Sequence, residues 1–134
     1  LNDSKIKFVD TVWDLENYSK NTIFAQQTDV AKQACTGDWL FYIQCDEAIN
    51  EDYLTLVKQA IEKYDADKEV EGLLFGFKHF WGDYGHYNQS HAFYPREIRV
   101  IRNLPQIHSW RDAQSFRYYE TFEPRYFYPN PYCS

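Results

Sequence analysis

Residues 34–54 read ACTGDWLFYIQCDEAINEDYL, and this stretch decides the expected fold. Its first part, Thr36-Gly37-Asp38, ends a preceding helix, because glycine adopts the left-handed conformation common at helix ends. The continuous apolar run at 39–43 then predicts a strand covered on both faces, as in a parallel sheet. The run ends in Gln44-Cys45-Asp46-Glu47, so two adjacent carboxylates follow a buried strand.

Regular elements are expected on both sides of this stretch. Asn21 or Thr22 caps a helix before it, and Asn50 caps a helix after it whose first turn is acidic. The expected strands lie at 6–9, 39–43, 70–80 and 97–102, and the expected helices at 24–35 and 51–64. In 97–102 charged and apolar residues alternate, which predicts a half-exposed strand. This order predicts an α/β fold. We assign 1–134 to one partial domain with an aromatic loop at 81–95 and an irregular C-terminal region at 104–134.

Composition excludes several classes of protein. With 44% hydrophobic and 25% charged residues, the chain resembles ordinary soluble proteins. Its formal charge of −6 argues against a nucleic-acid partner, which needs clustered basic residues. No apolar run approaches the roughly 20 residues of a membrane helix, which leaves peripheral membrane contact open.

The three cysteines, Cys35, Cys45 and Cys133, are odd in number and form no closely spaced pair. Neither a disulfide framework nor a zinc site is therefore indicated, and a reducing, cytoplasmic location is expected. Cys35 and Cys45 are expected to be inert thiols in the core.

Two further features concern the chain as a whole. It contains no methionine and begins with Leu1, which suggests a processed piece or a fragment. Aromatic residues make up 19% of it, with 12 Tyr, 10 Phe and 4 Trp. We expect an aromatic-rich surface or cleft.

The acidic strand end suggests metal chemistry. Adjacent carboxylates beside a buried strand are costly unless they are solvated or compensated by positive charge. Mg²⁺ or Mn²⁺ is a suitable compensator, because such ions are held by one or two carboxylates plus substrate phosphates. The alternative is that Asp46 and Glu47 simply lead into the next helix.

The stretch 34–54 resembles family 2 glycosyltransferases with the A-type fold. In that family a helix ends in a small residue–x–Gly turn, and an apolar strand then closes with an Asp-x-Asp motif. The resemblance is strongest over 22–64, and 72–87 and 97–103 resemble later strands of a bacterial branch. It implies a Rossmann-like three-layer sandwich with a mainly parallel sheet and helices on both faces, whose N-terminal strands would precede this chain.

The resemblance also implies site residues. Gln44 stands where the family usually has its first motif Asp, and Asp46 stands on the second, the usual metal ligand. Mn²⁺ or Mg²⁺ is thus expected at Asp46, with Gln44, Asp46 and Glu47 binding the nucleotide-sugar donor. Thr28 replaces an Arg that many members carry, so no donor-phosphate contact is expected there. These departures fit either a divergent donor preference or a member that has lost activity.

An inverting sugar transfer needs a base that takes the proton of the acceptor hydroxyl. Family members place an acidic residue well downstream of the metal motif, and Asp112 in HSWRDAQSF (108–116) is our candidate. The alternative is a surface Asp that pairs with Arg111 or caps a short helix. His108 is the second candidate base, since imidazole titrates near neutral pH.

The aromatic loop is the expected site for a glycan acceptor. Rings such as Trp81, Tyr84 and Tyr87 stack on the apolar faces of sugars, while Asp83 and His86 offer hydrogen bonds. The alternative is that these rings belong to the core.

Three functions are thus considered. The leading one is transfer of a sugar from a nucleotide-sugar to a glycan or other hydroxyl acceptor. The second is a carbohydrate-binding or interaction domain without catalysis, and the third is a metal-dependent phosphohydrolase. The third lacks a second carboxylate cluster in the sequence.

Overall fold

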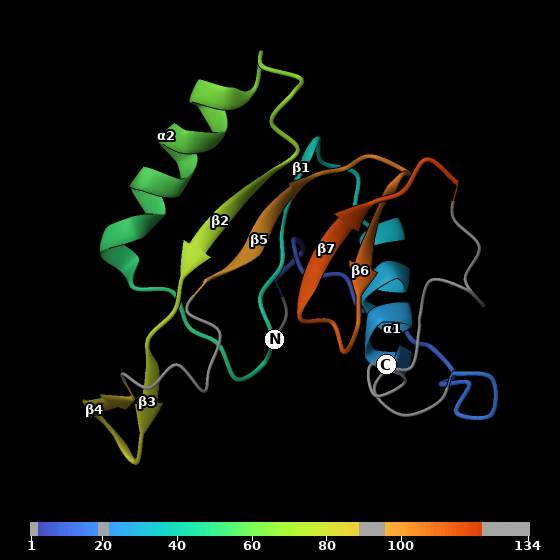
Figure 1. The fold of residues 1–134 in the computed structure, drawn as a ribbon, viewed down its shortest axis with the longest axis horizontal. Coiled ribbons are helices and arrows are strands. Elements are labelled where there is room, and N and C mark those ends of the chain that lie inside the picture. Colours follow the sequence, from blue (N-terminus) through green and yellow to red (C-terminus); the bar gives the residue numbers. More distant parts are fainter. Residues whose placement is uncertain (1–2, 19–21, 89–95, 122–134) are drawn as a thin grey trace. The chain divides into compact units, whose positions relative to one another are not determined.

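The computed structural model describes residues 3–18, 22–88 and 96–121, and it divides the chain into two compact units (Figure 1). The first unit comprises Leu1–Gly37 and Asn103–Ser134, and the second comprises Asp38–Arg102.

The first unit places one helix against one hairpin. Helix α1 (Thr22–Gln33) lies against strand β6 (Ile107–Trp110), which pairs antiparallel with β7 (Ser115–Tyr118). The buried apolar side chains come from both parts and are Ile23, Ala25, Ile107, Ala113 and Phe116. Burial of these side chains is the main stabilising term of this unit.

The C-terminal end of α1 is closed by residues that precede β6. The Asn103 amide donates to the carbonyls of Cys35 (3.3 Å) and Gly37 (2.9 Å), and Lys32 Nζ donates to the Leu104 carbonyl (2.8 Å). Carbonyls after the last helical turn lack partners within the helix, and side-chain donors satisfy them. The helix predicted at 24–35 is confirmed, and it begins at Thr22, one of the two predicted cap residues; the other, Asn21, lies outside the described residues.

The second unit is built on a three-stranded antiparallel sheet in the order β1–β5–β2. Its strands are β1 (Trp39–Phe41), β2 (Gly72–Gly76) and the central β5 (Arg96–Arg102). Val100 of β5 lies opposite both Phe41 and Leu73. Because both outer strands run antiparallel to β5, they run in the same direction as each other.

The expected Rossmann-like sandwich with a mainly parallel sheet is wrong. The described strands form three small sheets in which every pairing is antiparallel, and the described residues hold two α-helices. The apolar run 39–43 supplies only a short edge strand, whose Phe41 is 37% exposed. The strand expected at 6–9 is not formed either, and Phe8 is 75% exposed.

The central strand is instead the charged segment that the sequence predicted to be half exposed. Val100 and Ile101 are buried, but so are Arg99 and Arg102. Buried guanidinium groups are tolerated only where hydrogen bonds and opposite charge replace the lost water. Both arginines have such partners.

Arg102 binds the carbonyl groups at the end of helix α2 (Leu54–Tyr64). Its Nη2 donates to the carbonyls of Tyr64 (2.7 Å), Asp65 (3.0 Å) and Asp67 (2.8 Å), and its Nε donates to that of Val70 (2.7 Å). The Tyr64 and Asp65 carbonyls lie at the negative end of the helix dipole, and those of Asp67 and Val70 belong to the segment that follows the helix. The centre of the Trp39 ring lies 4.3 Å from the guanidinium carbon of Arg102. Arg102 of β5 therefore contacts both β1, through Trp39, and the segment that follows α2.

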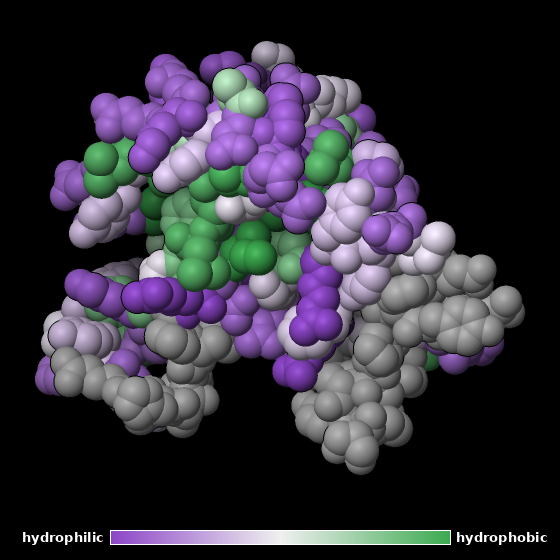
Figure 2. Space-filling view, turned by 45° about the horizontal axis from the view of Figure 1, so that its top comes forward, coloured by the Kyte–Doolittle hydropathy of each residue, from purple (hydrophilic) through white to green (hydrophobic). Residues whose placement is uncertain are grey.

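The start of α2 follows the prediction. Asn50 precedes the short 3₁₀ helix η1 (Glu51–Tyr53), and its side chain accepts a hydrogen bond from the backbone N–H of Asp52 (3.0 Å). Residues of α2 remain incompletely covered, and Leu54 and Leu56 are each about half exposed. Figure 2 shows an apolar area on the visible face of the molecule, bordered by hydrophilic side chains.

The aromatic segment expected as a loop forms a second hairpin. Strand β3 (His79–Trp81) pairs with β4 (Asp83–Asn88) around Gly82, whose φ of 79° favours glycine. The rest of the predicted loop, 89–95, lies outside the described residues, as does 122–134 of the predicted C-terminal region. Within the described ranges, no helix has the length and apolar character needed to cross a bilayer.

Both described cysteines contradict the prediction of core thiols. Cys35 and Cys45 are exposed, because each lies just beyond the end of a helix or strand.

Substituting Arg102 tests its role in the second unit. Arg102→Gln removes the charge and most donors to the α2 carbonyls, and we expect the free energy of unfolding to fall by about 3 kcal/mol. Arg96→Gln, at the exposed start of β5, is the control and should change it by less than about 0.5 kcal/mol. Urea unfolding followed by circular dichroism measures both. Equal effects of the two substitutions would contradict the role of Arg102.

Candidate functional site

The turn after β1 is held by a set of short-range hydrogen bonds. The Tyr42 N–H donates to the Arg99 carbonyl (2.8 Å), which continues the pairing with β5. The Gln44 N–H donates to Glu47 Oε2 (3.1 Å), and the Glu47 N–H donates to the Gln44 carbonyl (3.1 Å). The Gln44 amide donates to the Tyr42 hydroxyl (3.0 Å). The turn at 44–47 therefore has a defined shape.

Glu47 is bound by the second buried arginine of β5. Arg99 Nη2 lies 2.6 Å from Glu47 Oε1, and Nε donates to both carboxylate oxygens at 3.1–3.2 Å. The side chains of Arg99 and Glu47 are only 2% and 15% exposed. The rings of Phe77 and Tyr42 lie 4.8 and 5.4 Å from the guanidinium carbon. The carboxylate of Glu47 thus compensates the charge of Arg99.

Asp46 differs from Glu47 in its surroundings. It is exposed, and its carboxylate makes no hydrogen bond or ion pair with the described residues. A single carboxylate fits Mg²⁺ or Mn²⁺ that is also bound by water and substrate phosphates. In the described part of the chain, no group of three His, Cys, Asp or Glu side chains is suited to hold a metal. A cation at Asp46 would need ligands from its substrate.

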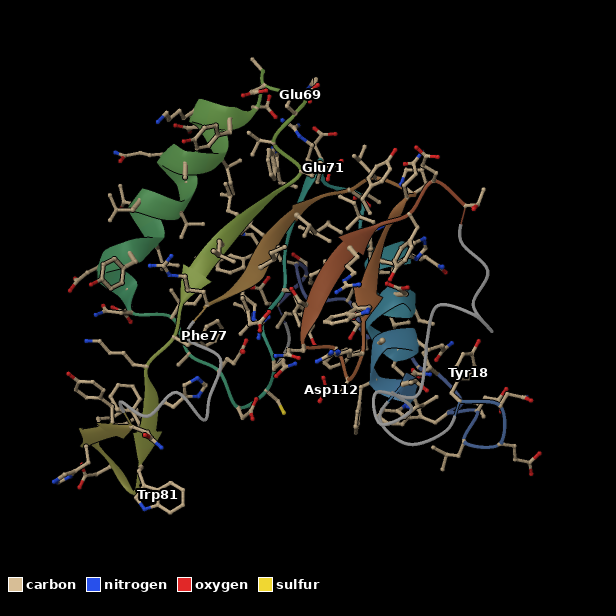
Figure 3. All side chains as sticks on the ribbon, in the orientation of Figure 1. Tyr18, Glu69, Glu71, Phe77, Trp81 and Asp112 are labelled. Atoms are coloured by element: carbon tan, nitrogen blue, oxygen red, sulfur yellow. The ribbon has the colours of Figure 1, made fainter. Side chains whose placement is uncertain are left out.

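Asp112 lies at the tip of the β6–β7 hairpin (Figure 3). Its neighbours Arg111 and Ala113 have φ values of 57° and 64°, a left-handed conformation that costs non-glycine residues roughly 1–2 kcal/mol each. The buried Ala113 side chain fixes one end of the turn, while Asp112 is exposed. Asp112 is thus a surface residue, as the alternative expected, but it makes no ion pair with Arg111 and lies in a hairpin turn.

His108 is held by a residue that the sequence analysis missed. Asp29 of α1 is 5% exposed, and its carboxylate accepts from the Ser109 N–H (2.8 Å) and contacts His108 Nδ1 (2.9 Å). A signal existed, because Asp29 follows the buried Ala25 by four residues and so shares its helix face. A charged residue on an apolar face needs a buried partner.

Burial affects two titratable groups in the first unit, and each also feels the charge of Asp29. Burial lowers the pKa of Lys32, although the negative charge of Asp29 acts to raise it. Burial also raises the pKa of the Tyr119 phenol, whose ring centre lies 6.2 Å from that of His108. Asp29 therefore lies at the centre of a partly buried polar cluster.

The predicted acceptor residues gather on the β3–β4 hairpin. Trp81 and Tyr84 are 76% and 84% exposed, and Tyr87 is 48% exposed. Asp83 Oδ1 accepts from the Gly85 N–H (2.7 Å) and lies 2.8 Å from His86 Nδ1. The alternative that these rings belong to a core is wrong. Figure 3 shows Trp81 at the end of this hairpin.

The predicted residues fall into separate groups. The 44–47 turn contains Asp46 in the second unit, and the β6–β7 hairpin contains Asp112 and His108 in the first. That Asp46 acts in one site with Asp112 or His108 stays a prediction.

No protein-family model, curated protein or solved structure matches the chain.

The Asp83–His86 pair leads to a prediction about pH. The hydrogen bond from His86, followed by that from the Gly85 N–H, lowers the pKa of Asp83 below its ordinary value of 3.8. A lowered folded-state pKa stabilises the hairpin above the unfolded pKa, and this contribution is lost as pH falls through the lowered value. We expect His86→Gln to raise the pKa of Asp83 toward 3.8, measured by NMR titration of its carboxyl carbon.

Asp14 provides the internal control for this titration. Its pKa is lowered by hydrogen bonds from Asn17 and should be the same in both proteins. An unchanged pKa of Asp83 in His86→Gln would contradict the assigned cause.

Proposed function

We propose that the chain takes part in the transfer of a sugar from a nucleotide-sugar donor to a hydroxyl acceptor. The proposal joins the resemblance of residues 34–54 to family 2 glycosyltransferases with the surroundings of Asp46. It does not require the parallel sheet that the resemblance implied.

The observation that carries the proposal is the difference between Asp46 and Glu47. Arg99 holds both oxygens of Glu47, while the carboxylate of Asp46 is exposed beside it. In the proposed reaction Asp46 would bind Mn²⁺ or Mg²⁺ together with the donor diphosphate. The cation would supply compensation for the charge that develops on the leaving phosphate.

Asp112 is proposed as the base that takes the proton from the acceptor hydroxyl. Its exposure and its position in a strained turn support the assignment, since strained backbone is concentrated at functional sites. His108, oriented by Asp29, is the alternative base. With nucleotide-sugar turnover as the readout, loss of kcat in Asp112→Asn but not in His108→Gln distinguishes them.

The cytoplasmic location predicted from the cysteines is part of the same proposal.

Metal and donor binding test the role of Asp46. We expect Asp46→Asn to weaken binding of Mn²⁺ in the presence of UDP-, GDP- or dTDP-sugars at least tenfold, because the variant loses the carboxylate ligand. Electron paramagnetic resonance of free Mn²⁺ and titration calorimetry measure it. Asp38→Asn, an exposed position just before β1, is the matched control and should bind like the original chain.

Equal binding by Asp46→Asn and the original chain, or no binding at millimolar ligand, would contradict the proposal.

A second candidate function rests on the exposed rings of the β3–β4 hairpin. Glycan-array binding without nucleotide or metal, lost in Trp81→Ala, would favour a carbohydrate-binding domain without catalysis.

A further inference from the structure

Two arginines contact one tryptophan ring on the β6–β7 hairpin. The guanidinium carbons of Arg111 and Arg117 lie 4.1 and 3.5 Å from the centre of the Trp110 ring. Trp110 is half-buried on β6, while both arginines are exposed. Contact with an aromatic ring uses the flat face of a guanidinium and leaves the N–H donors at its edge available. The two cations are therefore positioned without being neutralised.

Neither arginine has an acidic partner among the described residues. The side chains of Arg111 and Arg117 make no hydrogen bond or ion pair within that part of the chain. Asp112 lies between Arg111 and Ala113 in the turn but forms no ion pair with Arg111 or Arg117. In a chain with a formal charge of −6, two cations on one ring with no acidic partner in 3–18, 22–88 or 96–121 are a local departure from the overall charge.

Two further titratable side chains near the hairpin, His108 and Asp29, contact each other. His108 lies directly opposite Arg117 in the β6–β7 register, and its Nδ1 contacts Asp29. The Asp29 carboxylate also accepts from the Ser109 N–H, so both of its oxygens contact residues of β6.

The backbone also supports a defined arrangement. Arg111 has a φ of 57°, which an arginine adopts only at a cost in energy. Its contact with Trp110 is made from this conformation, and the buried Ala113 follows in the same region of φ. Such strain persists where surrounding contacts hold it and is frequent at ligand sites.

We propose that Arg111 and Arg117, held by Trp110, bind a phosphate group. Guanidinium donors match the paired oxygens of a phosphate, and two cations suit an anion that carries more than one negative charge. The phosphate belongs either to a soluble compound or to a lipid headgroup, and both present the same oxygens. The proposal holds whether or not Asp46 binds a metal.

Binding of inorganic phosphate and pyrophosphate by the full chain tests this site. We expect saturable shifts of the Trp110 indole N–H and the Arg117 Nε–H in NMR spectra, with sodium chloride at equal ionic strength as the reference. Arg111→Gln and Arg117→Gln should each weaken binding about tenfold or more, because each removes charge-assisted hydrogen bonds. Arg96→Gln, an exposed arginine of β5, should bind like the original chain.

A conservative variant keeps the test valid if a glutamine variant fails to fold. Arg117→Lys keeps the charge but loses the paired donors, and we expect weaker binding than in the original chain. Vesicles of phosphatidylcholine with or without phosphatidic acid distinguish a lipid phosphate from a soluble one. Shifts no larger than those with chloride, or equal binding by the arginine variants and Arg96→Gln, would overturn the proposal.

Discussion

The ion pair between Arg99 and Glu47 joins the central strand of the second unit to the turn that follows β1, over a distance of 2.6 Å. A guanidinium that is almost fully buried requires this carboxylate, because an unpaired charge in the interior is far costlier than a paired one. The turn at 44–47 must therefore adopt the conformation that brings Glu47 to Arg99. The same constraint leaves Asp46 as the exposed carboxylate of the turn.

Arg102 applies the same principle at the other end of β5. It binds the carbonyls after α2 and lies against the Trp39 ring, so the strand, the helix end and β1 depend on one side chain. The two arginines replace part of what apolar packing provides in other domains. This explains how a unit whose α2 side chains remain incompletely covered keeps a defined arrangement of its segments.

The sequence predicted the two helices better than it predicted the arrangement of the strands. The cap at Asn50 and the helical spacing of apolar residues predicted helices close to those observed, and α1 begins at Thr22 itself. The prediction of a covered central strand at 39–43 was wrong because apolar content does not distinguish a central strand from an edge strand. The prediction that 97–102 is half exposed was wrong because the arginines of β5 are buried with partners distant in sequence, Glu47 and the carbonyls after α2.

The candidate site was also predictable only in part. Asp46 and the exposed rings of the β3–β4 hairpin follow from their positions in sequence. The Asp29–His108 contact joins residues far apart in the chain, and only the buried helix face of Asp29 hinted at it. The contacts of Trp110 with two arginines depend on the register of a hairpin in 104–134, a region that was predicted to be irregular.

A double-mutant cycle on Arg99 and Glu47 tests the central claim most directly. The free energies of unfolding of Arg99→Gln, Glu47→Gln and the double variant give the coupling between the two side chains. The structure predicts a coupling of about 2 kcal/mol or more, as expected for a buried charge pair with several hydrogen bonds. A coupling below about 0.5 kcal/mol would contradict the account, because Glu47 would then not be held by Arg99.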